Sequence, residues 1–260
     1  MARWFLLADD AEGPSHAVRF FNLAIACIVL SALFYVAFRR VAYHWSWEPI
    51  WGYRQKFITG WLITLGLSVA ALAGSAVVGL VTALMRRSRV LIINYAAALY
   101  VELIRGTPLL VQILLFFYVI ANAARLENRY VAGVVILSLF AGAYISEIIR
   151  AGIESIADSQ LESARAIGLT PIQTYRYVVF PQAIRQTLPP LAGQFVSLIK
   201  DSSLLSIISI SEFTLNAQEV NAFTYSTLVS YVPLALGYLA LTLPLSLWTR
   251  QLERRFLYAT

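Results

Sequence analysis

Six long apolar stretches dominate the sequence and decide what kind of fold it can adopt. A helix needs about 20 apolar residues to cross the roughly 30 Å hydrocarbon core of a bilayer. The stretches that come close to or exceed this length are residues 20–38, 58–85, 91–120, 131–149, 191–210 and 228–248. Hydrophobic residues make up 59% of the chain and charged residues 13%, which leaves too little polar surface for a water-soluble globule. The sequence therefore predicts an all-α integral membrane protein and excludes a soluble enzyme.

Three of these stretches carry further information. The string RGTP at residues 105–108 interrupts the third, which predicts an interfacial lead-in followed by a kinked span. Acidic residues precede the first stretch and no small-residue cleavage site follows it, so we expect a retained anchor and not a signal peptide. The second stretch has Ala71, Ser75 and Gly79 at intervals of four, which lets another helix approach closely on that face.

The positive charges predict the orientation of the spans. If both termini are cytoplasmic, thirteen of the twenty Lys and Arg residues lie in cytoplasmic segments, six lie outside, and Arg105 falls within a span. This bias favours both termini inside the cell. The segment at residues 39–56 breaks the rule locally, and its Trp45, Trp47 and Trp51 predict a segment lying at the membrane interface.

Several other classes of protein are excluded by the same composition. The net charge is +6, but the Arg and Lys residues lie beside apolar stretches, where such residues fix the membrane orientation. The charge therefore does not indicate nucleic-acid binding. The single cysteine, Cys27, allows neither a disulfide framework nor a thiolate cluster. His16 and His44 are too isolated to indicate a metal site, so we expect no metal and no bound cofactor.

The polar segment between the fourth and fifth stretches, at residues 150–190, contains start and stop signals for two short helices. Ser159 followed by Glu162 is a capping-box pattern, which predicts a helix that begins at Gln160. Gly168 is placed to end this helix in a left-handed conformation.

The second helix of this segment has its own signals. Thr170 is the expected cap, Pro171 the first helical residue, and Gln173 the other half of a second capping box. We expect Pro181 to stop this helix and residues 189–190 to mark the entry to the fifth span. Spacing alone leaves two readings open, a structural connector or a rigid docking element on the cytoplasmic face.

The run ESARAIGLTPIQTYRYVVFPQAIRQTLPPL, which begins at Glu162, resembles the conserved cytoplasmic loop of ABC importer permeases. The pattern of that loop is Glu-Ala-Ala, three residues, Gly, nine residues, Ile, one residue and Leu-Pro. The matching positions are Glu162, Ala164, Gly168 and Pro181, with Ser163, Val178 and Phe180 as conservative replacements.

Three further strings resemble the polar amino acid branch of that family. They are VELIRGTPLLVQ at residues 101–112, AYISEIIRAGIESI at 143–156 and LIKDSSLLSII at 198–208. The resemblance implies a type I ABC importer fold with a five-helix core and one additional N-terminal helix. It implies an N-terminal region at residues 1–57, a permease domain at 58–252 with its coupling loop at 150–190, and a cytoplasmic tail at 253–260.

The resemblance also implies that the loop docks onto a cytoplasmic ATPase. Small residues in its first helix can seat closely against such a partner, and rigid caps transmit a displacement. The residues expected to form the coupling loop are Glu162, Ser163, Ala164, Gly168, Leu169, Thr170, Pro171 and Pro181. A P-loop needs Gly-Lys before Ser or Thr, and neither lysine of this chain has that context. We therefore expect ATP to be hydrolysed by a separate subunit.

Ionisable residues within apolar stretches are costly and mark candidate positions on the translocation pathway. Lys200 and Asp201, followed by Ser202, interrupt the fifth stretch and predict a helix break or a gate. Glu102 and Arg105 are three residues apart and are expected to pair across one helical turn. A third group, Glu147, Arg150 and Glu154, continues around one helical face, where solvated interfacial pairing is expected.

These features predict the permease subunit of an ATP-driven importer for a polar amino acid, in the bacterial inner membrane. The expected partners are an ABC ATPase subunit, a second permease subunit, the lipid bilayer and a substrate-binding protein docked outside on the loops at residues 122–130 and 212–227. Four alternatives remain: a secondary carrier, an ABC importer for another small polar solute, a membrane enzyme, and a receptor or assembly module. No second copy of the RGTP or IKDSS strings supports the secondary carrier, and no Gly-x-Ser-x-Gly or histidine cluster supports the enzyme.

Overall fold

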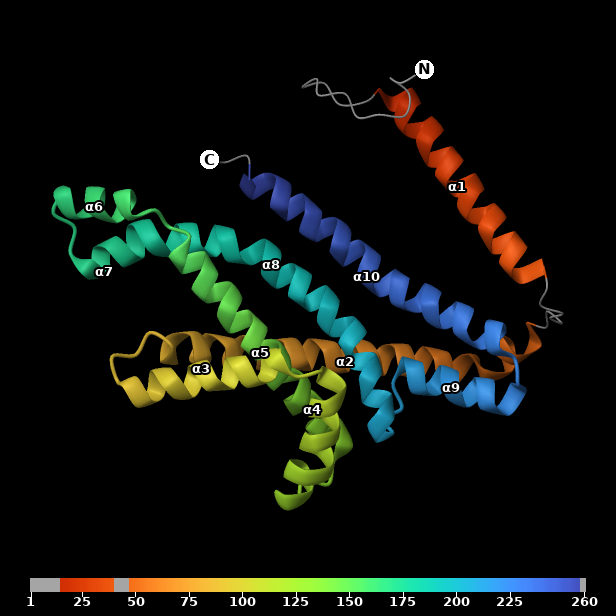
Figure 1. The fold of residues 1–260 in the computed structure, drawn as a ribbon. Helices are drawn as coiled ribbons and strands as arrows, with labels where there is room; N and C mark the ends of the chain where they lie inside the picture. Colours follow the sequence, from red (N-terminus) through yellow and green to blue (C-terminus); the bar gives the residue numbers. More distant parts are fainter. Residues whose placement is uncertain (1–14, 40–46, 258–260) are drawn as a thin grey trace. The chain divides into compact units, whose positions relative to one another are not determined.

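The computed structural model describes residues 15–39 and 47–257, and all regular structure in these ranges is helical (Figure 1). Two compact units divide the chain, one within residues 1–46 and one within residues 47–260. The acidic residues before the first stretch, His44 and Trp45 lie outside the described residues. The all-α prediction is confirmed for the described part of the chain.

The described part of the first unit is one helix, α1 (His16–Arg39). Its segment Ala17–Val36 is long and apolar enough to cross a membrane. The first apolar stretch of the sequence therefore forms a candidate spanning helix.

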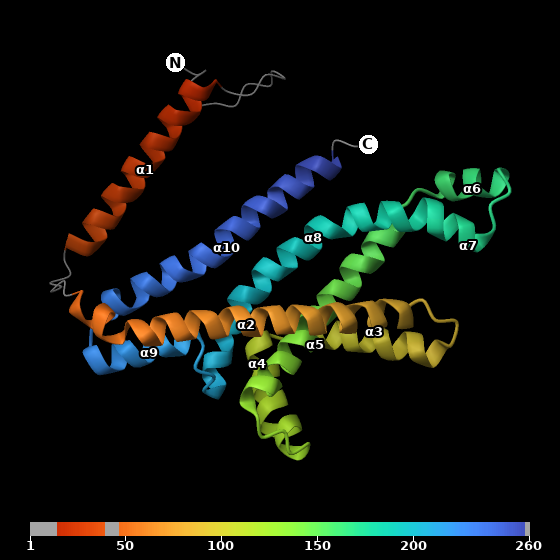
Figure 2. The same ribbon diagram turned by 180° about the vertical axis from the view of Figure 1, so that it is seen from behind.

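The second unit contains the remaining helices, which alternate long apolar elements with short connecting ones (Figures 1 and 2). Their order is α2 (Glu48–Met85), α3 (Leu91–Gly106), α4 (Leu109–Leu115), the π-helix η2 (Phe116–Ala121), α5 (Arg129–Glu154), α6 (Asp158–Ala166), α7 (Pro171–Thr174), the π-helix η3 (Tyr175–Val179), α8 (Phe180–Asp201), the 3₁₀-helix η4 (Ser202–Ile208), α9 (Phe213–Thr224) and α10 (Thr227–Leu257).

Five candidate spans lie in the second unit. Four are continuous helical segments, Ile50–Met85, Arg129–Glu154, Pro171–Ile208 and Thr227–Arg254. The fifth is the pair Leu91–Gly106 and Leu109–Ala121, whose two parts are bent by 112°. The predicted interruption at RGTP is thus present, and it is a sharp break between two helices instead of a kink within one. Residues 48–56, expected to belong to an interfacial segment, form the first turns of α2.

Helices α2 and α5 pack closely along their small residues. Ala71 and Ser75 are fully buried, and the hydroxyl of Ser138 donates a hydrogen bond to the Ala71 carbonyl at 3.3 Å. A Cβ atom built on Gly79 would lie 2.5 Å from the side chain of Ile145. Only glycine therefore permits this approach of the two backbones, which confirms the prediction from the four-residue spacing.

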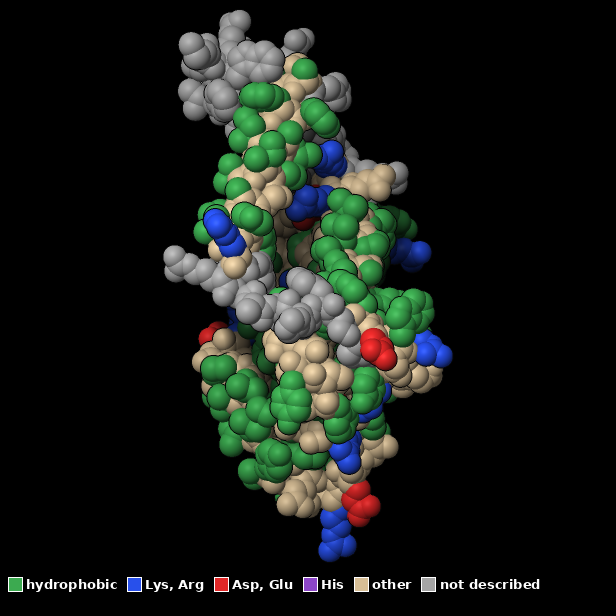
Figure 3. Space-filling model, turned by 90° about the vertical axis from the view of Figure 1, so that its right-hand side faces the viewer, with side chains coloured by type: hydrophobic (Ala, Val, Ile, Leu, Met, Phe, Trp, Pro, Cys, Tyr) green, Lys and Arg blue, Asp and Glu red, His purple; other side chains and the backbone are tan. Residues whose placement is uncertain are grey.

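The main core lies where α2, α4, α5, α8 and η4 meet. It is formed by Leu67, Ala71, Leu109, Ile113, Ile136, Leu137, Ala141, Leu198, Leu205, Ile208 and Ile210. Large apolar side chains also cover much of the outer surface, as Figure 3 shows for one face. Exposed apolar surface of this extent suits a lipid environment, because it would be unfavourable in water.

The second unit has two ends that differ in structure. The loop end carries α6 and α7, between the end of α5 and the start of α8 (Figures 1 and 2). The α9 end comprises α9 and the parts of α2 and α10 that pack against it, and it extends to the turn from α9 into α10 (Figures 1 and 2). Arg86, just after α2, pairs with Glu147 near the loop end, whereas Lys56, near the start of α2, pairs with Glu219 of α9.

Candidate functional site

Helix α6 opens the loop between the fourth and fifth spans, and its start differs from the prediction. It begins at Asp158, with Ala157 as the capping residue and no side-chain cap. The predicted capping box of Ser159 and Glu162 is therefore wrong, because Ser159 lies inside the helix, where its carbonyl accepts a hydrogen bond from the Ser163 hydroxyl at 2.8 Å. An acidic residue in the first turn, Asp158, favours the helix start in its place.

The turn between α6 and α7 follows the sequence prediction closely. Gly168 has a φ of +81°, and its amide and that of Leu169 donate to the carbonyls of Arg165 and Ala164. This closes α6 with a left-handed glycine, as predicted. Thr170 and Gln173 form a reciprocal capping box at the start of α7, also as predicted. Both ends of the turn are thus fixed by hydrogen bonds.

The loop helices are anchored to the rest of the second unit by a small hydrophobic cluster. Ile156, Val179 and Ala183 form its buried part, and Leu161 of α6 packs against them. Ala164 is also buried, whereas Glu162 and Ser163 are exposed. Of the residues expected on the coupling loop, Ala164 therefore serves the packing of the chain itself.

Pro181 does not stop the second loop helix, which corrects the prediction. The helical path continues from Pro171 through the π-helix η3 into α8 and reaches Asp201. Pro181 occupies the first turn of α8, where a missing amide hydrogen is tolerated. The preceding π turn absorbs the altered hydrogen bonding, and the Gln182 side chain donates to the Val178 carbonyl at 3.0 Å. Residues 189–190 lie inside α8 and do not begin it.

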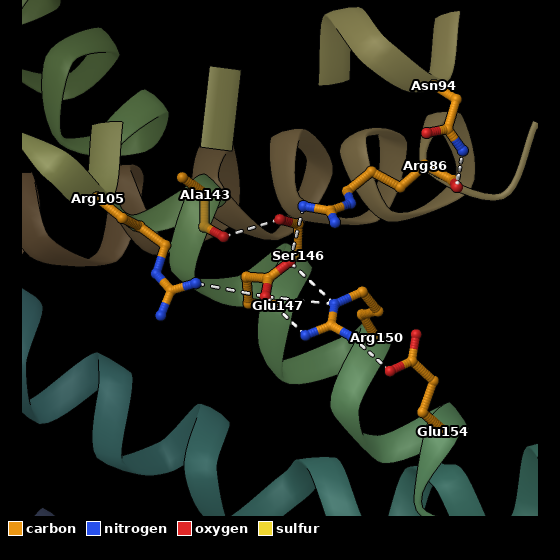
Figure 4. A network of polar contacts seen from close by, with 8 residues as sticks. All are labelled: Arg86, Asn94, Arg105, Ala143, Ser146, Glu147, Arg150 and Glu154. Atoms are coloured by element: carbon orange, nitrogen blue, oxygen red, sulfur yellow. Dashed lines mark hydrogen bonds and ion pairs between the residues drawn. The ribbon is translucent and has the colours of Figure 1, made fainter. Parts of the chain in front are cut away.

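A charged cluster lies on α5 next to the loop end and centres on Glu147 (Figure 4). The Glu147 carboxylate lies 3.1 Å from a nitrogen of Arg86, 3.3 Å from one of Arg105 and 2.9 Å from one of Arg150. Arg150 also pairs with Glu154. The Glu147 side chain is only 16% exposed, so the expectation of solvated pairing on this face is wrong for Glu147.

Arg105 reaches Glu147 from the end of α3, which replaces the predicted pair with Glu102. The structure gives no ion pair between Glu102 and Arg105, and Glu102 is exposed. The Arg105 guanidinium also lies 5.7 Å from the centre of the Tyr144 ring. An ion pair within one helix was the nearest choice along the sequence, but α3 packs against α5, which brings Arg105 beside Glu147.

The break itself is held by polar side chains. The Gln112 side-chain amide donates to the carbonyls of Ile104 and Thr107, at 2.7 and 3.0 Å, and the Thr107 hydroxyl donates to the Leu103 carbonyl. These bonds satisfy carbonyls at the end of α3 that no helical amide reaches. The RGTP turn is thus a defined structure with its own hydrogen bonds.

A cavity of about 590 Å³ lies beside the charged cluster, between α3, α5 and α8. Its polar lining includes two cations and one carboxylate, and its apolar lining comes mainly from α5 and from a proline of α8. The lining residues are Arg105, Tyr144, Glu147, Ile148, Arg150, Ala151, Gly152, Ser155, Gln186 and Pro190. Such a space can accommodate a small polar molecule or a rearrangement of the side chains around it.

The cavity lining does not include Lys200, Asp201 or Ser202. Helix α8 ends at Asp201 and the 3₁₀-helix begins at Ser202, so the predicted break is confirmed. Ser202 is fully buried, and its hydroxyl donates to the Ile199 carbonyl, whereas Lys200 is exposed. At 1.5 Å per residue, Lys200 lies about 15 Å further along α8 than Pro190, which lines the cavity.

One buried acidic residue was missed by the sequence analysis. Glu212 is completely buried and caps α9 by accepting hydrogen bonds from the amides of Thr214 and Leu215, both at 2.8 Å. It also accepts from the Tyr238 hydroxyl at 3.0 Å and, more weakly, from the Thr64 hydroxyl at 3.4 Å. An acidic residue beside an apolar stretch was the available signal, whereas Glu147 was noted as part of a charged group with Arg150 and Glu154.

Comparisons with known proteins place the chain among transporters. The family described as binding-protein-dependent transport system inner membrane component matches residues 75–258. The chain is 38% identical over 213 residues to the glutamine transport system permease protein GlnP of Escherichia coli strain K12, covering 81% of this chain and 97% of that protein.

It is also 39% identical over 193 residues to the L-cystine transport system permease protein TcyB of Bacillus subtilis strain 168, covering 74% and 82% of the two chains.

Solved structures agree with these sequence matches. A chain in the crystal structure of an amino acid ABC transporter with histidines has a TM-score of 0.75 and 36% identity, over 82% of this chain and 99% of that one. A chain of the inward-facing MetNI methionine ABC transporter has a TM-score of 0.62 at 16% identity, covering 80% and 98%, and supports the fold alone. The predicted type I ABC importer fold, with its five-helix core and additional N-terminal helix, is thereby confirmed.

Proposed function

The chain belongs to the family of binding-protein-dependent transport system inner membrane components and is a permease subunit of an ABC importer, and we propose that it carries a polar amino acid. The relatives named for glutamine and L-cystine support a substrate with both an amino and a carboxylate group. The permease provides the path through the membrane and carries out no covalent chemistry. We propose that it binds no metal and no cofactor.

The observation that carries this proposal is the rigid loop formed by α6, Gly168 and α7. The loop is capped at its turn, anchored by its own hydrophobic cluster and joined directly to α5 and α8. It also exposes large apolar side chains, with Ile167 at 77% and Ile172 at 81% of their full exposure. A rigid projection with an apolar tip suits docking to a partner, because the apolar area gains stability when it is covered.

We assign the partner at this loop as a separate ATPase subunit, which would hydrolyse ATP for transport. The complex would contain two permease subunits, identical or paired with a sister chain, and a binding protein docked outside near residues 122–130 and 212–227. In this arrangement the loop end faces the cytoplasm of a bacterial cell and the chain lies in the inner membrane with both termini inside. The Arg and Lys bias supports this orientation.

Two groups of residues remain candidates for the translocation pathway. Arg105 lines the cavity beside α5, and Lys200, Asp201 and Ser202 mark the change from α8 to η4. A pathway for zwitterionic amino acids benefits from groups of both signs. Glu102 has no part in the charged cluster of the described structure, and we assign it no role in the pathway.

Reconstitution of the complex in lipid vesicles tests the proposal. Vesicles would contain the permease, its ATPase and ATP on the ATPase side, with binding protein and one labelled amino acid on the other. We expect L-glutamine or another polar amino acid to stimulate ATP hydrolysis and to accumulate without any ion gradient. Uptake that needs a gradient and not ATP would favour the secondary carrier, and stimulation only by other solutes would overturn the amino acid assignment.

A labelling experiment tests the orientation separately. In a variant with Cys27 replaced by serine, expressed without the ATPase that would cover the loop tip, Ile172→Cys should react with an impermeant thiol reagent only from the cytoplasmic side. Reaction in intact cells from the outside would contradict the proposed orientation.

A further inference from the structure

Three helices that are distant in sequence are tied together by one carboxylate. Glu147 of α5 accepts hydrogen bonds from Arg86, which follows α2, from Arg105 at the end of α3, and from Arg150 of its own helix. Figure 4 shows these three guanidinium groups pointing at the Glu147 carboxylate from different sides. In the described part of the chain, Arg86 and Arg105 have no other acidic partner.

The position of Glu147 links two functional parts of the permease. Toward its C-terminus, α5 continues for two turns and then passes into the loop that begins with α6. Toward α3, Arg105 lies two residues before Thr107, which together with Gln112 holds the 112° break. A displacement of the loop therefore reaches the broken span through α5 and the contact between Glu147 and Arg105.

The charges explain why this contact is specific. Three guanidinium groups that converge within hydrogen-bonding distance of one point repel one another unless a carboxylate lies between them. Glu154 cannot replace Glu147, because it pairs only with Arg150, one turn away on the same helix, and its side chain is 57% exposed. Removing Glu147 would remove the ion pairs that join Arg86 and Arg105 to α5. Removing Glu154 would remove one ion pair on the surface of α5.

The cavity beside the cluster gives these charges room to change partners. Arg105, Glu147 and Arg150 all line it, and Arg105 is 43% exposed. A side chain with this much free space can swing without breaking the packed core, which lies elsewhere, where α2, α4, α5, α8 and η4 meet. The cluster can thus hold one arrangement of α3 against α5 and release it.

We infer that Glu147 is a positioning residue that transmits movement of the loop to the broken span of α3 and α4, by holding Arg86 and Arg105 against α5. This inference rests on the proposed function, because it assigns a part in ATP-coupled transport. Glu147 need not touch the amino acid. Its role predicts a change in the amount of amino acid transported per ATP hydrolysed.

The test compares Glu147→Gln with Glu154→Gln in the complete reconstituted complex, with L-glutamine or the screened amino acid that the wild type transports fastest. Both substitutions remove one carboxylate charge bonded to Arg150. We expect Glu147→Gln to lower uptake per ATP by about fivefold or more, because coupling between two sites usually changes an equilibrium by at least about that factor. We expect Glu154→Gln to keep the wild-type ratio.

A purely structural role would give a different result. It would reduce the amount of assembled complex, and uptake and hydrolysis would then fall together with an unchanged ratio, which would overturn the inference. If Glu147→Gln does not assemble, Arg105→Gln and Arg105→Lys decide instead. We expect Arg105→Gln to lower the ratio and Arg105→Lys, which keeps the charge, to restore most of it, and equal wild-type ratios for both would overturn the inference.

The proposed function fails in a distinguishable way. Wild-type vesicles that show no ATP-dependent uptake would overturn the proposed function together with this inference. Wild-type vesicles that transport normally, beside a Glu147→Gln variant with a normal ratio, would overturn only the inference.

Discussion

The two ends of the second unit each use one carboxylate to tie three helices, but with opposite chemistry. At the α9 end, Glu212 joins α2, α9 and α10 through neutral donors and is completely buried. At the loop end, Glu147 joins α2, α3 and α5 through three arginines beside a cavity. The two junctions therefore differ in the free-energy cost of breaking their hydrogen bonds.

A buried junction made of neutral donors is costly to break, because its groups are shielded from bulk water that could replace the lost partners. The α9 end is also packed tightly, since a Cβ atom on Gly60 would lie 2.9 Å from the Cα of Phe213. Arginines at a half-exposed cavity can exchange one partner for another or for water. We therefore expect the α9 end to stay fixed and the loop end to move during transport.

The largest effect on stability is expected for Glu212→Ala. This substitution removes the cap of α9 and the carboxylate that accepts from the Thr64 and Tyr238 hydroxyls, and of these two Tyr238 keeps the Thr214 hydroxyl at 3.0 Å as a partner. We expect a loss of about 2–4 kcal/mol, from the lost cap and the lost acceptor of buried hydroxyls together. Glu219→Ala on the same helix removes a half-exposed pair with Lys56 and should cost less than about 1 kcal/mol. Thermal unfolding of the detergent-solubilised complex measures both, and equal shifts would contradict the comparison.

A smaller loss of stability is expected for Gly60→Ala. The added methyl group would meet backbone atoms of Phe213 and Glu212, which cannot move aside, at a cost of about 1–3 kcal/mol. Gly66→Ala in the same helix is the control, because nothing lies within 4 Å of its added Cβ. That control should be neutral or stabilising by up to about 1 kcal/mol. Similar melting temperatures for the two variants would show that the α9 end is less tightly packed than described.

At the loop end, the two capping patterns of the sequence should behave differently. Thr170→Ala removes a capping box that the structure contains and should destabilise the loop by about 1 kcal/mol. Ser159→Ala and Glu162→Ala touch a capping box that does not form, so neither should have a capping effect. Limited proteolysis of the loop measures the local stability, and increased cleavage in Ser159→Ala equal to that in Thr170→Ala would contradict the assignment.

The smallest expected effect is a dependence of stability on pH at the α9 end. Burial raises the pKa of the Glu212 carboxyl, although the amides of Thr214 and Leu215 lower it in part. The folded state then binds the proton more tightly than the unfolded state. The resulting contribution of Glu212 to the free energy of unfolding is fully present below the ordinary pKa of about 4.3 and is lost as pH rises through the raised pKa. The stability of the wild type relative to Glu212→Gln should therefore fall as pH rises from that value toward neutrality. A difference in melting temperature that rises with pH would contradict the sign.

Much of this fold could be predicted from the sequence, because the signals were local. Apolar length gave the spans, the four-residue spacing from Ala71 to Gly79 gave the packing face, and Gly168 with Thr170 gave the turn of the loop. The errors concern choices that tertiary structure makes. Pro181 lies within a continuous helical path because a π turn precedes it, and Arg105 pairs with Glu147 and not with Glu102 because α3 packs against α5. The junction at Glu212 depends on Thr64 and Tyr238, which are far away in sequence.

The ratio of amino acid uptake to ATP hydrolysis, measured for Gly168→Asp and Gly60→Ala in the same kind of reconstituted vesicles, tests the central claim most directly. Gly168 has a φ of +81°, and an added Cβ meets no atom of the described chain within 4 Å, so within the permease the substitution strains the backbone of the loop, by about 1–2 kcal/mol. We predict that Gly168→Asp lowers uptake per ATP while the complex stays assembled, and that Gly60→Ala lowers the melting temperature but keeps the wild-type ratio. A normal ratio for Gly168→Asp, or an equal drop for Gly60→Ala, would contradict a fixed α9 end and a coupling loop end.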